Sequence, residues 1–253
     1  MKHTRSSTLW CYIFLLAAFA WFSAASMKGQ TATGWGEIWQ HRMSIGQARL
    51  DEAFKLAESG KTDEALNRID AVIASNPDNW RAYFLKAAVL VLLKRQNDAL
   101  QQIDVSIQLA RRSNVTQHLL AQLYSSKAQT CIDARRYEDA RRALDEAVRT
   151  DGGNTSTLND LAWLLATAPD TRVRNPHRAI ALGHKCCELS HWTDAYCIDT
   201  LAAAYAASGD FNQAVRCQQL AMQVLSQTER SEQLANMQDR LKLYSNHQPY
   251  LGD

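Results

Sequence analysis

Apolar residues recur along most of this chain at the three- and four-residue spacing of an amphipathic helix. Within that pattern a small residue is followed by alanine twelve positions later, and by another small or β-branched residue seven positions after that. The set recurs five times, and in the fourth set the first interval is seventeen residues instead of twelve. The five sets are Ala53/Ala65/Val72, Ala87/Ala99/Ser106, Ala128/Ala140/Ala147, Ala162/Ala179/Cys186 and Ala202/Ala214/Ala221.

This spacing predicts pairs of antiparallel helices. Two neighbouring helices of about a dozen residues approach closely only where both present small side chains at their crossing. Larger apolar side chains, three or four positions further along, would then fill the layers beside each crossing. They are Leu56, Leu90, Cys131, Leu165 and Tyr205 in the first helices, and Ile69, Ile103 and Leu144 in the second helices.

Turn and capping residues separate the predicted helices. We expect Gly60 and Gly209 each to end a helix in the left-handed conformation. Acidic residues then open the next helix at Asp63-Glu64 and Asp210-Phe211, where they complement the helix dipole. The run Pro77-Asp78-Asn79 is expected to stop one helix and to cap the following one.

Two stretches interrupt the regular spacing, and one helix follows the last set. Residues 114–120 add seven positions, which predicts a longer helix or loop there. Residues 167–176 contain two prolines and predict an extended loop within a hairpin. After the fifth set, apolar residues at helical spacing between Ser231 and Tyr244 predict a capping helix, which would cover the last apolar face.

These repeats resemble the tetratricopeptide-repeat (TPR) family, whose unit is a 34-residue helix-turn-helix. Ala53 and Ala87 are 34 residues apart, as are Ala128 and Ala162. The resemblance implies an all-α, right-handed TPR superhelix (α-solenoid) of about five helix-turn-helix repeats plus a C-terminal capping helix. Its expected boundaries are a TPR domain at 46–228, with repeats at 46–79, 80–113, 121–154, 155–193 and 195–228, then a capping helix and tail at 229–253.

Part of the repeat resembles a narrower group. The runs Leu158–Thr167 and Asp199–Tyr205 are similar to a TPR variant found in exported or envelope proteins of planctomycete-like bacteria. This similarity favours a location in the cell envelope.

The N-terminus has the pattern of an export signal. Basic residues between Lys2 and Arg5 precede an apolar run from Leu9 to Phe22, and small residues follow at 23–26. The pattern predicts either a signal peptide over 1–25 that is cleaved near Ala25, or an uncleaved membrane anchor. The anchor stays open because residues 9–25 are 17 in number, at the lower limit for crossing a bilayer.

Both alternatives place the rest of the chain outside the cytoplasm. The protein would be exported, and either periplasmic or secreted, or tethered to the membrane by residues 9–25. Residues 26–45 are expected to hold a linker and the start of the first helix, which could begin as early as Trp35.

Composition and charge narrow the classes of function. The apolar fraction of 46% suits a packed protein, and the 28 Lys and Arg residues nearly balance 26 Asp and Glu residues. Such a balance argues against nucleic acid as a partner, because phosphate binding needs a basic excess. The sequence contains no Gly-x-Ser-x-Gly, no phosphate-binding glycine loop and no His-Glu-x-x-His motif. We therefore expect no enzyme activity and no cofactor.

The TPR resemblance implies that the first helix of each pair lines a concave groove that binds peptides. Phe84 and Trp163 would be its aromatic anchors, because exposed aromatic residues dominate binding energetics; alternatively, both pack against neighbouring helices. Arg81 and Asn159 could hold a peptide backbone or a carboxylate. The full set of expected groove residues is Arg81, Phe84, Gln122, Ser125, Gln129, Asn159 and Trp163.

The cysteines suggest one cross-link and no metal site. Cys187 and Cys197 are expected on adjoining helices, where an oxidising compartment would allow a disulfide. Cys186 stands at a helix crossing and is expected to be a small buried hydrophobe. His184, Cys187 and His191 share one face of a predicted helix, but no second pair of ligands completes a metal site.

Together these patterns predict a non-catalytic scaffold that acts outside the cytoplasm and binds a segment of a protein or peptide partner in the concave groove. The alternative is a self-associating structural module of the cell envelope, which would use the apolar N-terminal run or the C-terminal cap.

Overall fold

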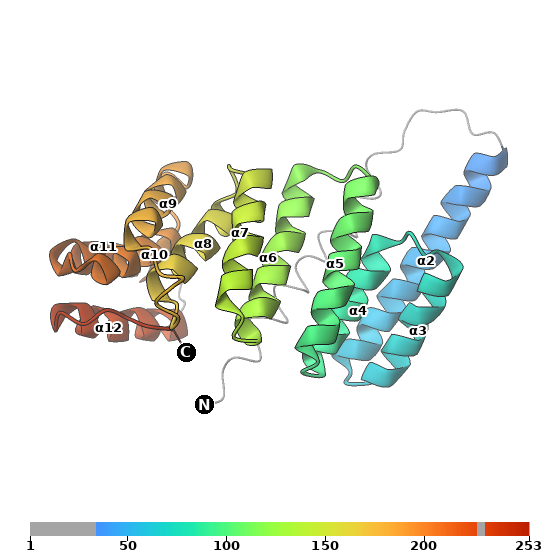
Figure 1. The fold of residues 1–253 in the computed structure, drawn as a ribbon, viewed down its shortest axis with the longest axis horizontal. Coiled ribbons are helices and arrows are strands. Elements are labelled where there is room, and N and C mark those ends of the chain that lie inside the picture. The colour runs from blue at the N-terminus through green and yellow to red at the C-terminus, as the bar shows by residue number, and fades with distance from the viewer. Residues whose placement is uncertain (1–33, 227–230, 253) are drawn as a thin grey trace. The chain divides into compact units, whose positions relative to one another are not determined.

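The structure is a computed structural model that describes residues 34–226 and 231–252. Over these residues it contains eleven helices and no strand, which confirms the all-α prediction (Figure 1). The helices are α2 (Gly34–Glu58), α3 (Thr62–Ser75), α4 (Trp80–Leu92), α5 (Gln96–Arg112), α6 (Gln117–Asp133), α7 (Tyr137–Thr150), α8 (Thr155–Thr167), α9 (Pro176–Leu189), α10 (Ala195–Ser208), α11 (Phe211–Ser226) and α12 (Ser231–Ser245).

The predicted signal peptide or anchor at 1–25 lies outside the described residues, as does most of the expected linker. The first described helix begins at Gly34, close to the early start expected at Trp35. None of the helices in 34–226 and 231–252 is both long and apolar enough to span a membrane.

The chain divides into two compact units, one up to Ala134 and one from Arg135. In the first unit, each helix from α2 to α6 packs against the next one along the chain. In the second unit, α7 to α12 do the same, and α10 also packs against α8 (Figure 1). This pairing of neighbours is the arrangement that the repeat predicts.

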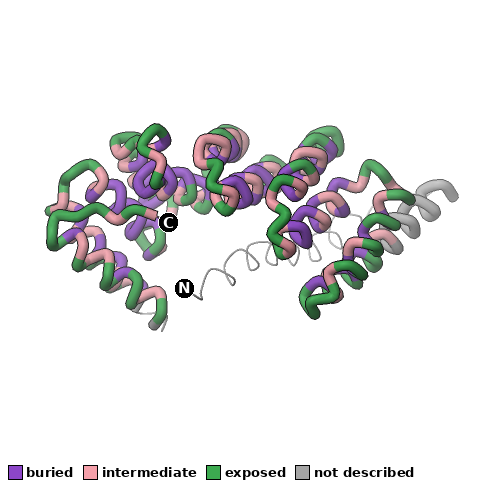
Figure 2. Tube along the Cα trace, turned by 60° about the horizontal axis from the view of Figure 1, so that its bottom comes forward, coloured by how far each residue is buried: buried purple, intermediate pink, exposed green. Residues whose placement is uncertain are grey.

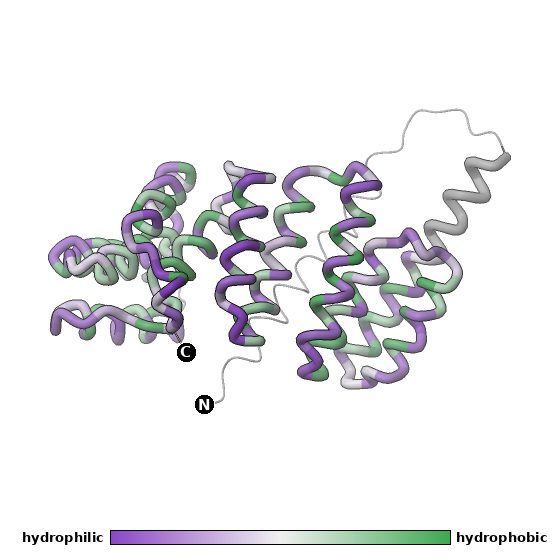
Figure 3. The backbone as a smooth tube through the Cα atoms, viewed as in Figure 1, coloured by the Kyte–Doolittle hydropathy of each residue, from purple (hydrophilic) through white to green (hydrophobic). Residues whose placement is uncertain are grey.

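Small residues lie where the helices meet. All members of the five predicted sets are buried, and none exceeds 1% exposure. Figure 2 shows the corresponding buried stripes along the helices, and Figure 3 shows apolar residues alternating with polar ones along each helix. The larger side chains at Ile69, Ile103 and Leu144 are equally buried, and those at Leu90, Cys131 and Leu165 are buried as well. Leu56 and Tyr205, predicted to fill the same layers, are only half-buried. The crossing prediction is therefore confirmed.

Three of the turns inside the hairpins, those after α2, α4 and α10, share one backbone geometry. Gly60 and Gly209 have φ angles of +81° and +87°, which confirms the left-handed turns predicted there. Lys94 occupies the corresponding place after α4 with a φ of 58°. In each turn the next residue donates its N–H to a carbonyl five positions back, as from Arg95 to Leu90 at 2.9 Å. The end of each of these helices therefore keeps this closing hydrogen bond whether the left-handed residue is glycine or lysine.

The predicted caps are present, with one correction. Asp210 accepts a hydrogen bond from the N–H of Gln213 at 3.1 Å, and acidic residues occupy the first turn of α3. Asn79 precedes α4 as expected, but its side chain accepts no capping hydrogen bond. The N–H of Ala82 is 3.0 Å from the backbone oxygen of Asn79 instead, so the cap is made by the main chain.

The irregular stretches have different outcomes. Residues 168–175 form the predicted loop, in which the buried Val173 faces inward and Asn175 caps α9 by accepting from Arg178 N–H at 3.1 Å. Of residues 114–120, the first three connect α5 to α6 and the last four form the first turn of α6. Both helices have 17 residues.

Candidate functional site

The expected groove residues fall in both units. The first unit holds Arg81 and Phe84 on α4, and Gln122, Ser125 and Gln129 on α6; the second holds Asn159 and Trp163 on α8. Most of these side chains are half-buried. Phe84 is the exception, with 0% exposure. Phe84 therefore packs in the core of its unit, because its side chain faces the neighbouring helices and not the solvent. This is the alternative that the sequence left open to its role as an aromatic anchor.

Half-buried polar groups line one face of α6. Gln122, Ser125 and Gln129 stand at the helical spacing of three and seven residues and share that face. The Nε2 atom of Gln122 lies 3.1 Å from the ring of His118, and Gln129 donates to Asp133 at 3.0 Å. Among the described residues, the buried hydroxyl of Ser125 has no hydrogen-bond partner. This face is polar and lacks an aromatic anchor among these positions.

Arg81 keeps its place at the start of α4. Its guanidinium lies 4.6 Å from the ring centre of Trp80, and burial lowers the pKa of Arg81. The stacked side chain is held against its own helix, which fixes where the charge lies.

A buried ion pair organises the second unit. Asp199 on α10 is 4% exposed and receives two hydrogen bonds from Arg240 on α12, at 3.0 Å from Nε and 2.8 Å from Nη2. Gln218 on α11 donates to the same carboxylate at 2.7 Å. Burial raises the pKa of Asp199, and Arg240 and Gln218 partly offset that rise. Three helices thus meet at one carboxylate, which requires all of these donors once it is removed from water.

Arg240 also contacts two aromatic rings. Its guanidinium lies 5.4 Å from the ring centre of Trp163 and 5.7 Å from that of Tyr250. The two rings are 5.7 Å apart and tilted by 42°. Cation–π and aromatic ring contacts hold flat groups against each other, and they allow more than one relative arrangement of those groups. Trp163 and Arg240 are both half-buried, and both contact the flat ring of Tyr250; this pair of side chains is called the slot below.

The segment after α12, residues 246–252, fills this slot and is called the tail below. His247 has a φ of 55° and lies against Phe211, with ring centres 5.3 Å apart. At the far end, the N–H of Gly252 donates to the carbonyl oxygen of Thr167, at the end of α8, at 2.8 Å. The tail therefore runs from the end of α12 back to the end of α8.

Several buried polar atoms around Asp199 and Trp163 remain unsatisfied. In the part of the chain that the structure describes, Gln218 Oε1, Tyr244 OH and Asn159 Oδ1 are buried without a hydrogen-bond partner. Burial raises the pKa of Tyr244, and the nearby Asp199 and Tyr250 raise it as well. The hydroxyl of Tyr244 therefore stays protonated and can donate a hydrogen bond.

Sequence reasoning missed two members of this site. The sequence pattern assigns Arg240 to the capping helix and Tyr250 to the tail, and it predicts no contact of either residue with Trp163. A usable signal was present, because Arg240 interrupts the apolar stripe of Met237, Leu241 and Tyr244, and a charge so placed needs a buried partner.

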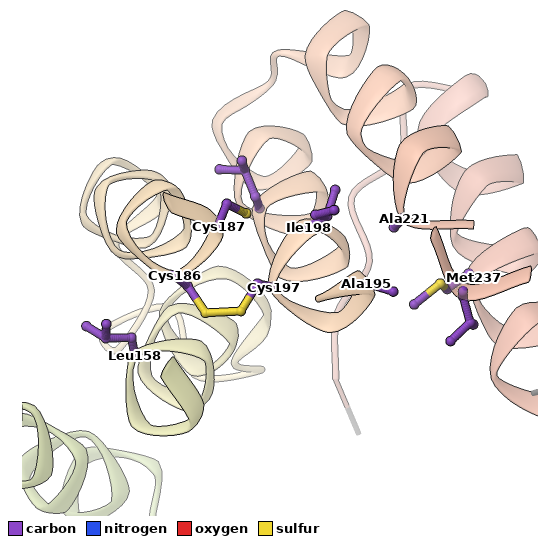
Figure 4. Packing of buried hydrophobic residues seen from close by; sticks show 10 residues of the cluster. Leu158, Cys186, Cys187, Ala195, Cys197, Ile198, Ala221 and Met237 are labelled. Atoms are coloured by element: carbon purple, nitrogen blue, oxygen red, sulfur yellow. A yellow bond between two sulfur atoms is a disulfide. The ribbon is translucent and has the colours of Figure 1, made fainter. Parts of the chain in front are cut away.

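The disulfide prediction needs correction. The structure joins Cys197 to Cys186, not to Cys187 (Figure 4). Adjacent helical residues point about 100° apart, so only Cys186, at the crossing of α9, faces α10 at Cys197. Cys187 is a buried free thiol, and desolvation raises its pKa to about 12.

The three residues weighed as metal ligands do not share a helix face. Helix α9 ends at Leu189, and His191 follows it with a φ of 50°. His184 lies 2.7 Å from the hydroxyl of Tyr205, and Cys187 is fully buried. Among the residues described, no group of three His, Cys, Asp or Glu side chains is placed to hold a metal ion.

No protein-family model and no curated protein matches this sequence. Solved structures match the fold. MamA from Desulfovibrio magneticus RS-1 has a TM-score of 0.58 at 14% identity, over 73% of this chain and 97% of that one. A second MamA structure has a TM-score of 0.57 at 16% identity, over 73% and 95%.

YrrB, described as a TPR protein with an unusual peptide-binding site, has a TM-score of 0.57 at 14% identity, over 83% of this chain and all of that one. At such identities the likeness concerns the fold alone. The chain thus has the fold of TPR proteins, an α-solenoid of stacked helical hairpins.

Proposed function

We propose that this protein is a non-catalytic interaction scaffold that binds an extended segment of a protein partner on the second unit. The binding face consists of Trp163 on α8 and Arg240 on α12, with the carbonyl of Thr167 at its edge. The observation that carries the proposal is that these three groups already hold a piece of chain, through a ring contact and a main-chain hydrogen bond.

The chemistry of this face suits peptide recognition. Trp and Arg are over-represented among residues that dominate binding energy, and a carbonyl that accepts a main-chain N–H binds a segment regardless of its side chains. The ion pair to Asp199 holds Arg240 in place before any partner arrives, which lowers the entropy lost on binding. The peptide-binding site of YrrB, a protein of the same fold, supports the same use here.

Action outside the cytoplasm is part of this proposal. The basic, apolar and small residues of 1–26 have the order of an export signal. The disulfide between Cys186 and Cys197 supports an oxidising compartment, since such bonds rarely persist in the cytosol. A membrane tether through residues 9–25 is the alternative to a released, periplasmic or secreted protein.

A specific observation favours self-association as the second candidate. Three large hydrophobic side chains near the α9–α10 turn are exposed: Leu189 at 44%, Trp192 at 39% and Tyr196 at 37%. Exposed apolar side chains this close along the chain can mark an interface between copies. Sedimentation over a range of protein concentrations separates the candidates, because a strict monomer excludes this second one.

The test of the proposed face compares Trp163 with an exposed apolar residue elsewhere in the second unit. The chain from residue 27 is used to capture partners from an extract of its host, and the captured proteins are identified and quantified. We expect Trp163→Ala to reduce recovery of the specific partner at least about tenfold, as expected for loss of about 1.4 kcal/mol or more from an aromatic anchor. Leu220→Ala is the matched control, because it shortens an exposed apolar side chain on α11 of the same unit, away from both candidate surfaces. Equal recovery by both variants would remove the assignment.

A further inference from the structure

The tail is held at few points. The ring of His247 lies 5.3 Å from that of Phe211, Tyr250 contacts the slot of Trp163 and Arg240, and Gly252 bonds to Thr167. Between α12 and Tyr250 every residue of the tail is exposed, and Leu251 is 46% exposed. A segment with so little buried surface is held weakly, because the apolar area removed from water sets most of the free energy of binding.

The connection to α12 also favours release. The chain reverses at His247, whose φ of 55° is a left-handed conformation that non-glycine residues rarely adopt. The N–H of Gln248 bonds to the carbonyl of Leu243 at 2.9 Å, so this turn belongs to the end of α12 rather than to the slot. Residues 249–252, which make the contacts to the slot, can therefore leave it while α12 and its closing turn stay folded.

We propose that the tail is an intramolecular ligand that competes with partner segments for the slot, and that those segments share its chemistry. The partner would present an aromatic ring and, two residues later, a free main-chain N–H, as Tyr250 and Gly252 do. This inference rests on the proposed function, since it assigns the occupant of the same face.

The contacts set the selectivity of the slot. A Cβ atom at position 252 would lie 3.6 Å from the carbonyl oxygen of Thr167, an ordinary contact, so residues other than glycine fit there. Proline does not fit, because it has no N–H to donate. The ring is then the selective feature, and its flat face must reach both Trp163 and Arg240.

The tail also sets a threshold for partners. A segment on a short connection has an effective concentration of about a millimolar. If the tail binds its slot with a dissociation constant of about 0.1 mM, it occupies the slot about nine-tenths of the time and weakens a competing peptide about tenfold. Only partners that bind clearly better than the tail would then displace it.

A labelled tail peptide tests the competition. The probe is a fluorescein-labelled, amidated peptide of residues 246–252, titrated with the full chain and followed by anisotropy. We expect Tyr250→Ala, which empties the slot, to bind the peptide about tenfold more tightly than the unaltered chain does. Leu251→Ala is the matched control, because it shortens an exposed neighbour in the tail, and it should leave the affinity unchanged.

Two further variants keep the outcome decisive. Gly252→Pro removes the N–H donor without touching the ring, and should also raise the affinity for the peptide. Combining Trp163→Ala with Tyr250→Ala should abolish the gain in affinity for the peptide. Equal affinities of the unaltered chain and both tail variants, with unchanged circular dichroism, would overturn the inference. In that case dependence of partner capture on Trp163 would still support the proposed function, so the two failures are distinguishable.

Discussion

At the residue scale, Gly183 shows how closely α9 and α10 approach. A Cβ atom added there would lie 3.2 Å from Cδ1 and 3.3 Å from the backbone Cα of Leu201. The backbone atom cannot move aside as the tip of a flexible side chain could. Close packing therefore favours glycine at this position, although glycine inside a helix lowers helix stability by about 1 kcal/mol relative to alanine.

We predict that Gly183→Ala lowers the stability of the second unit by about 1–3 kcal/mol, because overpacking outweighs the better helix propensity. The matched control is Gly46→Ala in α2, where the nearest atom, Nδ2 of Asn79, is 4.0 Å away. The Gly46→Ala change should stabilise the first unit by up to about 1 kcal/mol. Urea denaturation followed by circular dichroism measures both, and a rise in the midpoint for Gly183→Ala would contradict the prediction.

At the element scale, the Asp199–Arg240 pair fastens α12 to α10. Both side chains are shielded, at 6% and 14% exposure, so loss of one partner leaves a charge without compensation. A cap helix covers the last apolar face of a solenoid. The polar network therefore supports both the cap and the position of Arg240 in the slot.

We predict that Asp199→Ala destabilises the attachment of α12 by about 3–5 kcal/mol. Replacing both partners by Leu and Met should cost less, because no charge remains buried. Hydrogen exchange of the α12 amides measures the effect. The control is Asp239→Ala, which breaks a pair with Lys242 at 73% and 74% exposure and should change little. Similar exchange in the two single variants would refute a special role of the buried pair.

At the scale of the whole molecule, each unit has its own core. One cluster surrounds Ile69 in the first unit, and another in the second contains Ile198 with both cysteines of the disulfide. In a repeat protein each hairpin is stabilised mainly by its neighbours. A local loss of stability should therefore stay local.

We predict that the double variant Cys186→Ser/Cys197→Ser lowers the stability of the second unit by about 3 kcal/mol, since the disulfide closes a separation of 11 residues. Amides of α3 and α4 should keep their exchange rates. Cys217→Ser, at a half-buried free thiol, should have a smaller effect. Uniform loss of protection along the chain would show that the units do not behave separately.

The amino-acid sequence by itself determined the helical hairpins. Small residues such as Ala87 and Ala99 recur at intervals that only close-packed helices require, and Gly60 and Gly209 mark turns that need a left-handed residue. These features follow from local conformation and short-range spacing, so they can be predicted without coordinates. The same intervals carry the resemblance to the TPR family, and that resemblance implied the expected solenoid.

Only the tertiary structure decided which residues meet. Whether Cys186 or Cys187 faces Cys197, and whether Phe84 is exposed, depends on how each helix is rotated about its axis. The meeting of Trp163 with Arg240 and Tyr250 joins segments far apart in the chain, and it depends on where the tail folds back. The local pattern indicates that Arg240 needs a buried partner, but it does not show which residues meet it, because those contacts arise from the packing of several helices at once.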